Sequence, residues 1–231
     1  MKQIIIFFAA FFLLTGAIYA QVVDEKPVEK PFEDYNERPY PITNIPVSPE
    51  VAGFMAYFHD SDVGNLRVFS SFKDTLDYGY YFKGREIGPA EKELFTKEFH
   101  DLIKSGEAYA TYNIKGNAGD HYIIRMPTNK GANTLWLFNI EGEVVKPVQL
   151  LAYAFCQGDY CYQQDSWITD LDGDADLDIL VKFRRTRADT KEIVEKTQKV
   201  YLQNEDGDFR HVENGLISFD PSKFEMEDLK Y

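Results

Sequence analysis

Aspartate occupies every second position of the segment 170–178, which reads Asp-Leu-Asp-Gly-Asp-Ala-Asp-Leu-Asp. Carboxylates this close repel one another, and a pair about 4 Å apart costs on the order of 4 kcal/mol at an effective dielectric constant near 20. A hard cation among the oxygens relieves that repulsion, and calcium fits because it accepts about six to eight oxygen ligands in a flexible shell. The sequence therefore predicts a calcium site formed by Asp170, Asp172, Asp174, Asp176 and Asp178.

A solvated turn between two strands is the alternative explanation of the same acids. Such a turn keeps the carboxylates apart in water and needs no metal. Strict alternation of acids around Gly173 is denser than a plain turn requires, so we favour the metal site.

No recognisable catalytic motif accompanies these acids in the sequence. The histidines, His59, His100, His121 and His211, are scattered without metal-ligand spacing. Nucleophile-elbow, zinc-protease and phosphate-loop patterns do not occur. Acidic pairs are too numerous for a glycosidase pair to be singled out. The sequence thus favours a non-enzymatic binding module, with a secreted hydrolase acting on an extracellular polymer as the alternative.

The first twenty residues have the layout of a secretory signal peptide. Lys2 gives a positive start, Ile4–Leu14 is apolar, and small residues precede Gln21. No later segment is apolar for long enough to span a bilayer. We expect a soluble mature chain of residues 21–231, secreted or periplasmic.

The formal net charge of the chain is −13, and it becomes −14 when Lys2 leaves with the signal peptide. An acidic chain disfavours nucleic acid and anionic lipid as partners and suits cation binding. We therefore expect any partner to be an extracellular protein or a glycan.

Two groups of aromatic residues could form a platform for such a partner, although packing within the fold is the commoner use of these rings. The groups are Tyr78, Tyr80, Tyr81 and Phe82, and Tyr160, Tyr162 and Trp167. A basic cluster is expected to be a solvated hairpin face, with partner docking as the alternative. Its members are Lys182, Arg184, Arg185 and Arg187.

The chain has two cysteines, Cys156 and Cys161. In an exported protein a local disulfide is favoured over two unpaired thiols. The four-residue gap differs from the two-residue gap of redox motifs.

The pattern of apolar residues predicts a mainly β fold with one packed helix (α+β). Residues 21–50 hold six of the ten prolines and predict an extended arm. Short aromatic runs between 51 and 87, including 53–58 and 78–82, predict strands. Residues 89–105 predict the helix, because Pro89 opens an apolar stripe that Gly106 ends. Later strands are expected at 122–126, 135–138, 148–153, 179–183 and 199–202, and the charged insert 184–199 is either a short helix or a hairpin tip.

An internal repeat organises the second half of the chain. A shift of 57 residues lays 113–121 on 170–178, and a shift of 65 lays 139–144 on 204–209. The repeated unit spans about 107–151 in a degenerate copy and 164–217 in the Asp-rich copy, within 107–220, and 221–231 is a tail. Lys115 stands where the second copy has Asp172, and a lysine repels a cation. We therefore expect the 113–121 loop to bind no metal.

The segment 169–181, followed by 200–209, resembles an FG-GAP/VCBS repeat of the integrin alpha type. That family builds blades of β-propellers, and its Asp-rich loop typically holds calcium. The resemblance implies side-chain ligands from Asp170, Asp172, Asp174 and Asp178, and a backbone carbonyl ligand from Asp176.

Two departures from calcium-loop patterns qualify this resemblance. Ala175 stands where calcium loops often need glycine, and Val181 stands where an EF-hand needs a bidentate glutamate. The apolar strand expected after Asp178 also argues against an EF-hand. A closed propeller needs at least about four blades. The mature chain has room for about three units, so we expect blade-like repeats that do not close a ring.

Overall fold

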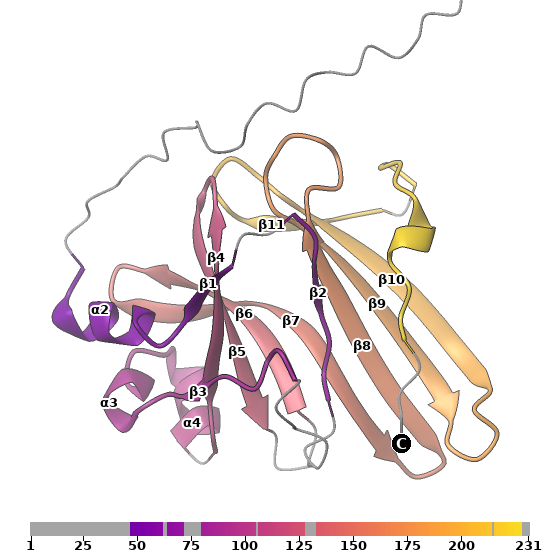
Figure 1. Ribbon diagram of the computed structural model, residues 1–231, viewed down its shortest axis with the longest axis horizontal. Helices are drawn as coiled ribbons and strands as arrows, with labels where there is room; N and C mark the ends of the chain where they lie inside the picture. The colour runs from indigo at the N-terminus through magenta and orange to yellow at the C-terminus, as the bar shows by residue number, and fades with distance from the viewer. Residues whose placement is uncertain are drawn as a thin grey trace, which may run out of the picture. The chain divides into compact units, whose positions relative to one another are not determined.

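An open sheet of eleven strands dominates the computed structural model of the protein (Figure 1). The strands are β1 (His59–Ser61), β2 (Leu66–Val68), β3 (Arg85–Glu86), β4 (Tyr109–Gly116), β5 (Gly119–Pro127), β6 (Asn133–Glu141), β7 (Val144–Gln157), β8 (Tyr160–Thr169), β9 (Asp178–Arg187), β10 (Ile193–Gln203) and β11 (Phe209–Val212). The structure describes residues 47–61, 64–71, 80–104, 106–127, 133–213 and 215–227. The predicted signal peptide and the arm up to residue 46 lie outside these residues.

Strands β4 to β11 follow one another as antiparallel neighbours in chain order. The predicted copies at 107–151 and 164–217 fall mainly on β4–β7 and β8–β11, which hold four strands each, and their bounds at 151 and 164 lie inside β7 and β8. The halves are joined by hydrogen-bonded pairing of β7 with β8, from Tyr153↔Gln164 to Gln157↔Tyr160. The fold is thus mainly β. Its sheet is continuous and is not closed into a propeller.

Three short elements add to this meander from the N-terminal part of the chain. β1 pairs with β4 in parallel, and β3 pairs with the start of β4. β2 pairs with the end of β8, from Leu66↔Ile168 to Val68↔Ser166. β8 therefore has β7 beside its first half and β2 beside its second half.

Alternation of side chains along the strands divides the core between the two faces of the sheet. One face buries a cluster that includes Ile123, Leu137 and Ile179. On the opposite face, Tyr122 and its neighbours pack against the helices. Farther along the sheet a third cluster, which includes Trp167, Leu171, Leu180, Val200 and Phe224, packs beneath the C-terminal segment.

The structure corrects the predicted helix at 89–105. Two helices, α3 (Pro89–Lys92) and α4 (Lys97–Lys104), replace it. Between them the backbone pairs with β7: Val145 N donates to Leu94 O at 2.8 Å, and Thr96 N donates to Val145 O at 3.2 Å. Phe95 is buried there against Phe138. Tertiary pairing therefore overrides a helical pattern that was continuous in sequence.

A helix also replaces the strand predicted at 53–58. Helix α2 (Pro49–Met55) begins where the Ser48 side chain accepts a hydrogen bond from Val51 N and where Pro49 occupies the first turn. Val51 and Phe54 form its buried side. Residues 49 and 50, which were assigned to the predicted arm, are therefore helical, and the fold has helices besides the one predicted.

The charged insert forms the β9–β10 hairpin, which confirms the hairpin alternative. Its turn is closed by Arg187 N donating to Glu192 O at 2.8 Å. The described part of the 221–231 tail, residues 221–227, contains the 3₁₀ helix η3 (Pro221–Lys223).

The predicted disulfide between Cys156 and Cys161 is present. The two residues lie directly opposite each other in the β7–β8 register. Gly158 has φ +59° in the intervening turn, a conformation that glycine adopts without strain. The disulfide therefore cross-links β7 and β8 next to the turn of the hairpin that joins the two halves of the sheet.

Replacing both cysteines (C156A with C161A) is expected to lower the free energy of unfolding by about 2 kcal/mol, as a short closed loop predicts. Urea denaturation measures the loss. Reduction of the wild-type protein should reproduce it and should leave the double variant unchanged. An unchanged urea midpoint in the double variant would refute this role for the disulfide.

Candidate metal centre

The Asp-rich segment is the loop of the β8–β9 hairpin. Thr169 and Asp178 form the last pair of that ladder, so residues 170–177 cross from one strand to the next. Leu171 and Leu177 are buried on either side of the loop. These two leucines fix the ends of the loop in the core and leave the acids between them toward solvent.

Three of the predicted ligands lie together. Asp170, Asp172 and Asp174 each offer one carboxylate oxygen, and these oxygens lie within 4.8 Å of one another. Asp172 and Asp174 are exposed. We call these three residues the acidic triad. Asp176 and Asp178 are not members of it.

The carboxylates of the triad also fold the loop. Asp170 accepts hydrogen bonds from Gly173 N at 2.6 Å and from Ala175 N at 3.0 Å. Asp172 accepts from Asp174 N at 3.3 Å, and Asp174 accepts from Asp176 N at 2.9 Å. Because each acid caps a backbone N–H farther along, alternation of aspartates gives a tightly wound loop.

The backbone turns sharply at Gly173 and Ala175, where φ is +89° and +70°. The sequence marked Ala175 as a position where calcium loops often use glycine, and the structure places it in the left-handed region. An L-residue there costs roughly 1–2 kcal/mol. The hydrogen bond from Ala175 N to Asp170 offsets part of that cost.

Asp178 has a different position from that of a surface ligand. Its side chain is only 1% exposed. It accepts hydrogen bonds from Leu171 N at 2.8 Å and from Gln203 N at 3.1 Å. Burial raises the pKa of the Asp178 carboxyl to about 7, and the two N–H donors act in the opposite direction. Asp178 therefore ties the start of the loop to β10.

Asp176 faces the equivalent turn of the other half of the sheet. Asn117 Nδ2 donates to Ala175 O at 2.9 Å and to the Asp176 carboxylate at 3.2 Å. The 113–121 segment, expected to bind no metal, is the β4–β5 hairpin with Asn117 and Ala118 at its tip. Its Lys115 pairs with Asp60 at 2.9 Å. The two turns related by the repeat thus lie against each other.

Gln203 is a residue of this region that sequence reasoning missed. Its side-chain oxygen accepts from Leu177 N at 3.2 Å, and its amide nitrogen donates to Gly207 O at 3.2 Å. It therefore links the Asp-rich loop to the β10–β11 turn. Its place 25 residues beyond Asp178 gave no local signal.

The donor set of the triad fits a hard cation. All donors are carboxylate oxygens, which calcium and magnesium prefer, whereas zinc sites draw on nitrogen and sulfur. Burial, and next the negative charge of Asp174, raise the pKa of Asp172. A divalent cation would offset that repulsion. Three carboxylates could supply up to about six oxygens, and water would complete a calcium shell.

No protein-family model, curated protein or solved structure matches this chain. These comparisons therefore assign the chain to no family, and the description of the fold and of the loop rests on the structure alone.

The histidines do not assemble with the acidic triad. His100 pairs with Glu93 at 2.8 Å, and His211 packs on Tyr201. His121 is buried against Phe209, and burial lowers the pKa of its imidazole. Among the described residues, only the three aspartates of the triad form a cluster of potential metal ligands.

The residues of each predicted aromatic platform do not share one exposed face of the sheet. Tyr80 and Phe82 are buried in the core, Tyr81 is 73% exposed, and Tyr78 lies outside the described residues. Tyr160 and Tyr162 share one face of β8, whereas Trp167 is buried on the other face. Neither group forms a single flat surface.

In the described part of the chain, no helix has the length and apolar character needed to cross a membrane.

The variant D178A is expected to destabilise the fold by about 2–5 kcal/mol in calcium-free buffer. The change leaves the N–H groups of Leu171 and Gln203 without an acceptor in a buried site. Urea unfolding measures the loss. The matched variant D172N keeps an oxygen for Asp174 N and should change stability by less than about 0.5 kcal/mol. Equal losses in the two variants would disprove the separate role of Asp178.

Proposed function

We propose that the protein is an exported, non-enzymatic calcium-binding module in which calcium fixes the β8–β9 loop. The observation that carries the proposal is the acidic triad, Asp170, Asp172 and Asp174, with one oxygen of each within 4.8 Å of the others. The disulfide is compatible with an oxidising location. The signal-peptide layout of residues 1–20 supports export.

The arrangement of the sheet supports the likeness to FG-GAP/VCBS repeats. Each four-stranded half begins with a hairpin, β4–β5 or β8–β9, whose tip carries the repeated loop. We infer that the halves are blade-like units in which only the second loop takes calcium. Lys115, beside the tip of the first loop, supports this difference because its positive charge repels a cation.

Calcium in this position would act on three turns at once. The Asp-rich loop contacts Asn117 of the β4–β5 turn and Gln203 of β10, and Gly207 lies close to Ala118. Fixing the loop would therefore rigidify one end of the sheet. We propose that this end of the sheet, or the adjoining surface that it rigidifies, binds an extracellular protein or a glycan.

Calcium is expected to stabilise the domain by about 1.4 kcal/mol at a concentration tenfold above its dissociation constant. That corresponds to a rise of several degrees in the melting temperature. A thermal melt in calcium-free buffer, with and without added calcium, measures it. Unchanged melting on removal of calcium would refute the proposal.

Matched variants locate this effect. D172N removes a charge from the triad and should abolish most of the calcium increment. D206N removes the same charge from the exposed β10–β11 turn and should retain the increment. Mass measurement should find one calcium per chain, and two would show that the 113–121 loop also binds.

The calcium increment is expected to grow between about pH 4 and pH 7. The folded chain raises the pKa of Asp178 from 3.8 to about 7 and also raises that of Asp172. Raised carboxyl pKa values mean that the folded state binds more protons, so calcium-free stability falls as the pH rises through this window. Calcium favours the ionised carboxylates of the triad. Urea denaturation with and without calcium, at about pH 4 and about pH 7, measures the calcium increment. Equal increments at the two pH values would contradict the coupling between calcium binding and ionisation of the carboxylates.

A further inference from the structure

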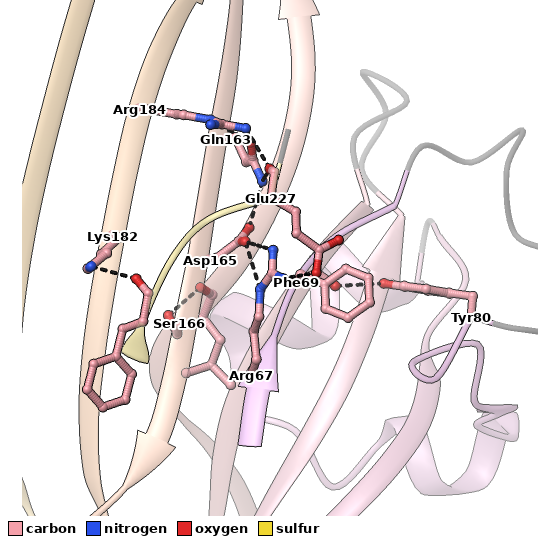
Figure 2. Close-up of polar contacts among 11 residues, drawn as sticks. Arg67, Phe69, Tyr80, Gln163, Asp165, Ser166, Lys182, Arg184 and Glu227 are labelled. Carbon is pink, nitrogen blue, oxygen red and sulfur yellow. Dashed lines mark hydrogen bonds and ion pairs between the residues drawn. The ribbon is translucent and has the colours of Figure 1, made fainter. Parts of the chain in front are cut away.

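The C-terminal segment 219–227, here called the strap, lies over one face of β8 and β9 (Figure 2). Within the described part of the chain it contributes no strand to the sheet. Phe224 is its only buried residue, and the centroid of this ring lies 5.9 Å from that of Trp167. One anchored ring and a set of side-chain contacts therefore hold the strap, which is how a domain binds a short peptide.

Three side chains beneath the strap donate hydrogen bonds to its backbone carbonyls. Lys182 Nζ donates to Phe224 O. Arg184 Nη2 donates to Glu227 O at 2.6 Å, and Gln163 Nε2 donates to the same oxygen at 3.3 Å. Every peptide has carbonyl oxygens, so these donors bind the main chain of the strap and do not depend on its side chains.

Arg67, in contrast, recognises a side chain of the strap. Its Nη1 donates to the Glu227 carboxylate at 2.6 Å, and its Nη2 donates at 2.6 Å to Asp165, which is fully buried (Figure 2). Because Asp165 fixes the guanidinium, Arg67 is preorganised for a carboxylate at the place that Glu227 occupies.

The Phe224 ring enters an apolar pocket. The buried residues around the ring are Trp167, Leu171, Leu180 and Val200. They belong to β8, the Asp-rich loop, β9 and β10, so strand pairing fixes the pocket. We call the face under the strap the seat, which comprises this pocket together with Arg67, Gln163, Lys182 and Arg184.

The strap fills the seat incompletely. A cavity of about 540 Å³ remains between the strap and the β9–β10 hairpin, and Glu225 and Met226 line it from the strap. The core of a stable interface is packed as densely as a protein interior, which leaves few voids larger than a water molecule. A segment with a larger apolar side chain at position 225 or 226 would gain contacts that the strap does not make.

We propose that the seat is a docking site for an extended segment of an extracellular protein, and that the strap occupies it as an intramolecular competitor. The partner segment has an aromatic residue for the pocket, a glutamate three positions later for Arg67, and a large apolar side chain between them for the cavity. The carbonyl contacts of Lys182 and Arg184 follow the spacing of a peptide backbone, which favours a protein over a glycan. The proposal rests on the proposed function only for the extracellular location of the partner, and it does not need calcium.

Competition with the strap sets what a partner must achieve. Because the strap belongs to the same chain as the seat, its effective concentration there is on the order of millimolar. The apparent affinity of a partner falls with the fraction of molecules whose seat is open. A variant that loosens the strap should therefore bind the partner more tightly, whereas a strap that is only part of the core would give no peptide binding in any variant.

The test titrates a fluorescent peptide of sequence 219–227, with M226W to fill the cavity, into the full chain in calcium-free buffer. The protein variant E227Q loses the ion pair of an exposed glutamate with Arg67 and should bind the peptide about threefold more tightly than the wild type, as measured by anisotropy. The protein variant F224A withdraws the anchor and should bind the peptide more than about tenfold more tightly. Absent binding, or equal affinity for the wild type and E227Q, would overturn the proposal.

Matched controls locate the contact. E213Q removes the same charge from an exposed residue outside the strap and should bind the peptide as the wild type does. E227Q keeps the buried ring and the backbone contacts of the strap, so it stays folded even where F224A does not. In the peptide, F224A should abolish binding, and restoring Met226 should weaken it. Equal affinity for E213Q and E227Q, or unchanged binding of either altered peptide, would refute the seat.

Discussion

The buried carboxylate of Asp178 holds one end of this sheet together through two backbone N–H groups that belong to distant parts of the chain. A single intramolecular hydrogen bond contributes about 0.5–1.5 kcal/mol, and the contribution is larger when the acceptor is ionised. Here they join the start of the β8–β9 loop, at Leu171, to the end of β10, at Gln203. The acidic triad depends on this joint, because a loop without it would have no fixed base from which to bring its carboxylates together.

The same joint separates two kinds of aspartate that look alike in sequence. Asp170, Asp172 and Asp174 point their oxygens at one another and at the loop backbone, where a cation could bind. Asp178 faces inward and acts as part of the core. The alternation that suggests five equivalent ligands therefore mixes three clustered carboxylates that could hold a metal with one structural anchor, Asp178, and one residue, Asp176, that contacts a neighbouring turn.

Sequence patterns predicted the strands at 122–126, 135–138, 148–153, 179–183 and 199–202, because apolar runs of this kind leave few other ways to bury both faces of a sheet. They were wrong at 53–58, which is mostly helical, and at 78–82, whose described residues 80–82 form a turn. They also predicted the disulfide, since Cys156 and Cys161 are the two cysteines of a chain with the layout of an exported protein and lie close together in sequence. They failed where long-range contacts decide. The helical stripe at 89–105 is broken by pairing with Val145, which lies far along the chain. Gln203 carries no local mark of its contact with the Asp-rich loop, and the seam between β7 and β8 could not be predicted from two separate repeats.

The C-terminal segment 219–227 has a consequence for how the chain acquires its structure. Phe224 and its neighbours cover Trp167, Leu180 and Val200, so that apolar face stays open to solvent until this segment has been synthesised and has packed there. The second half of the meander is therefore completed only when residues 219–227 have docked. Trimming by a protease after residue 220 would leave the same face bare and prone to self-association.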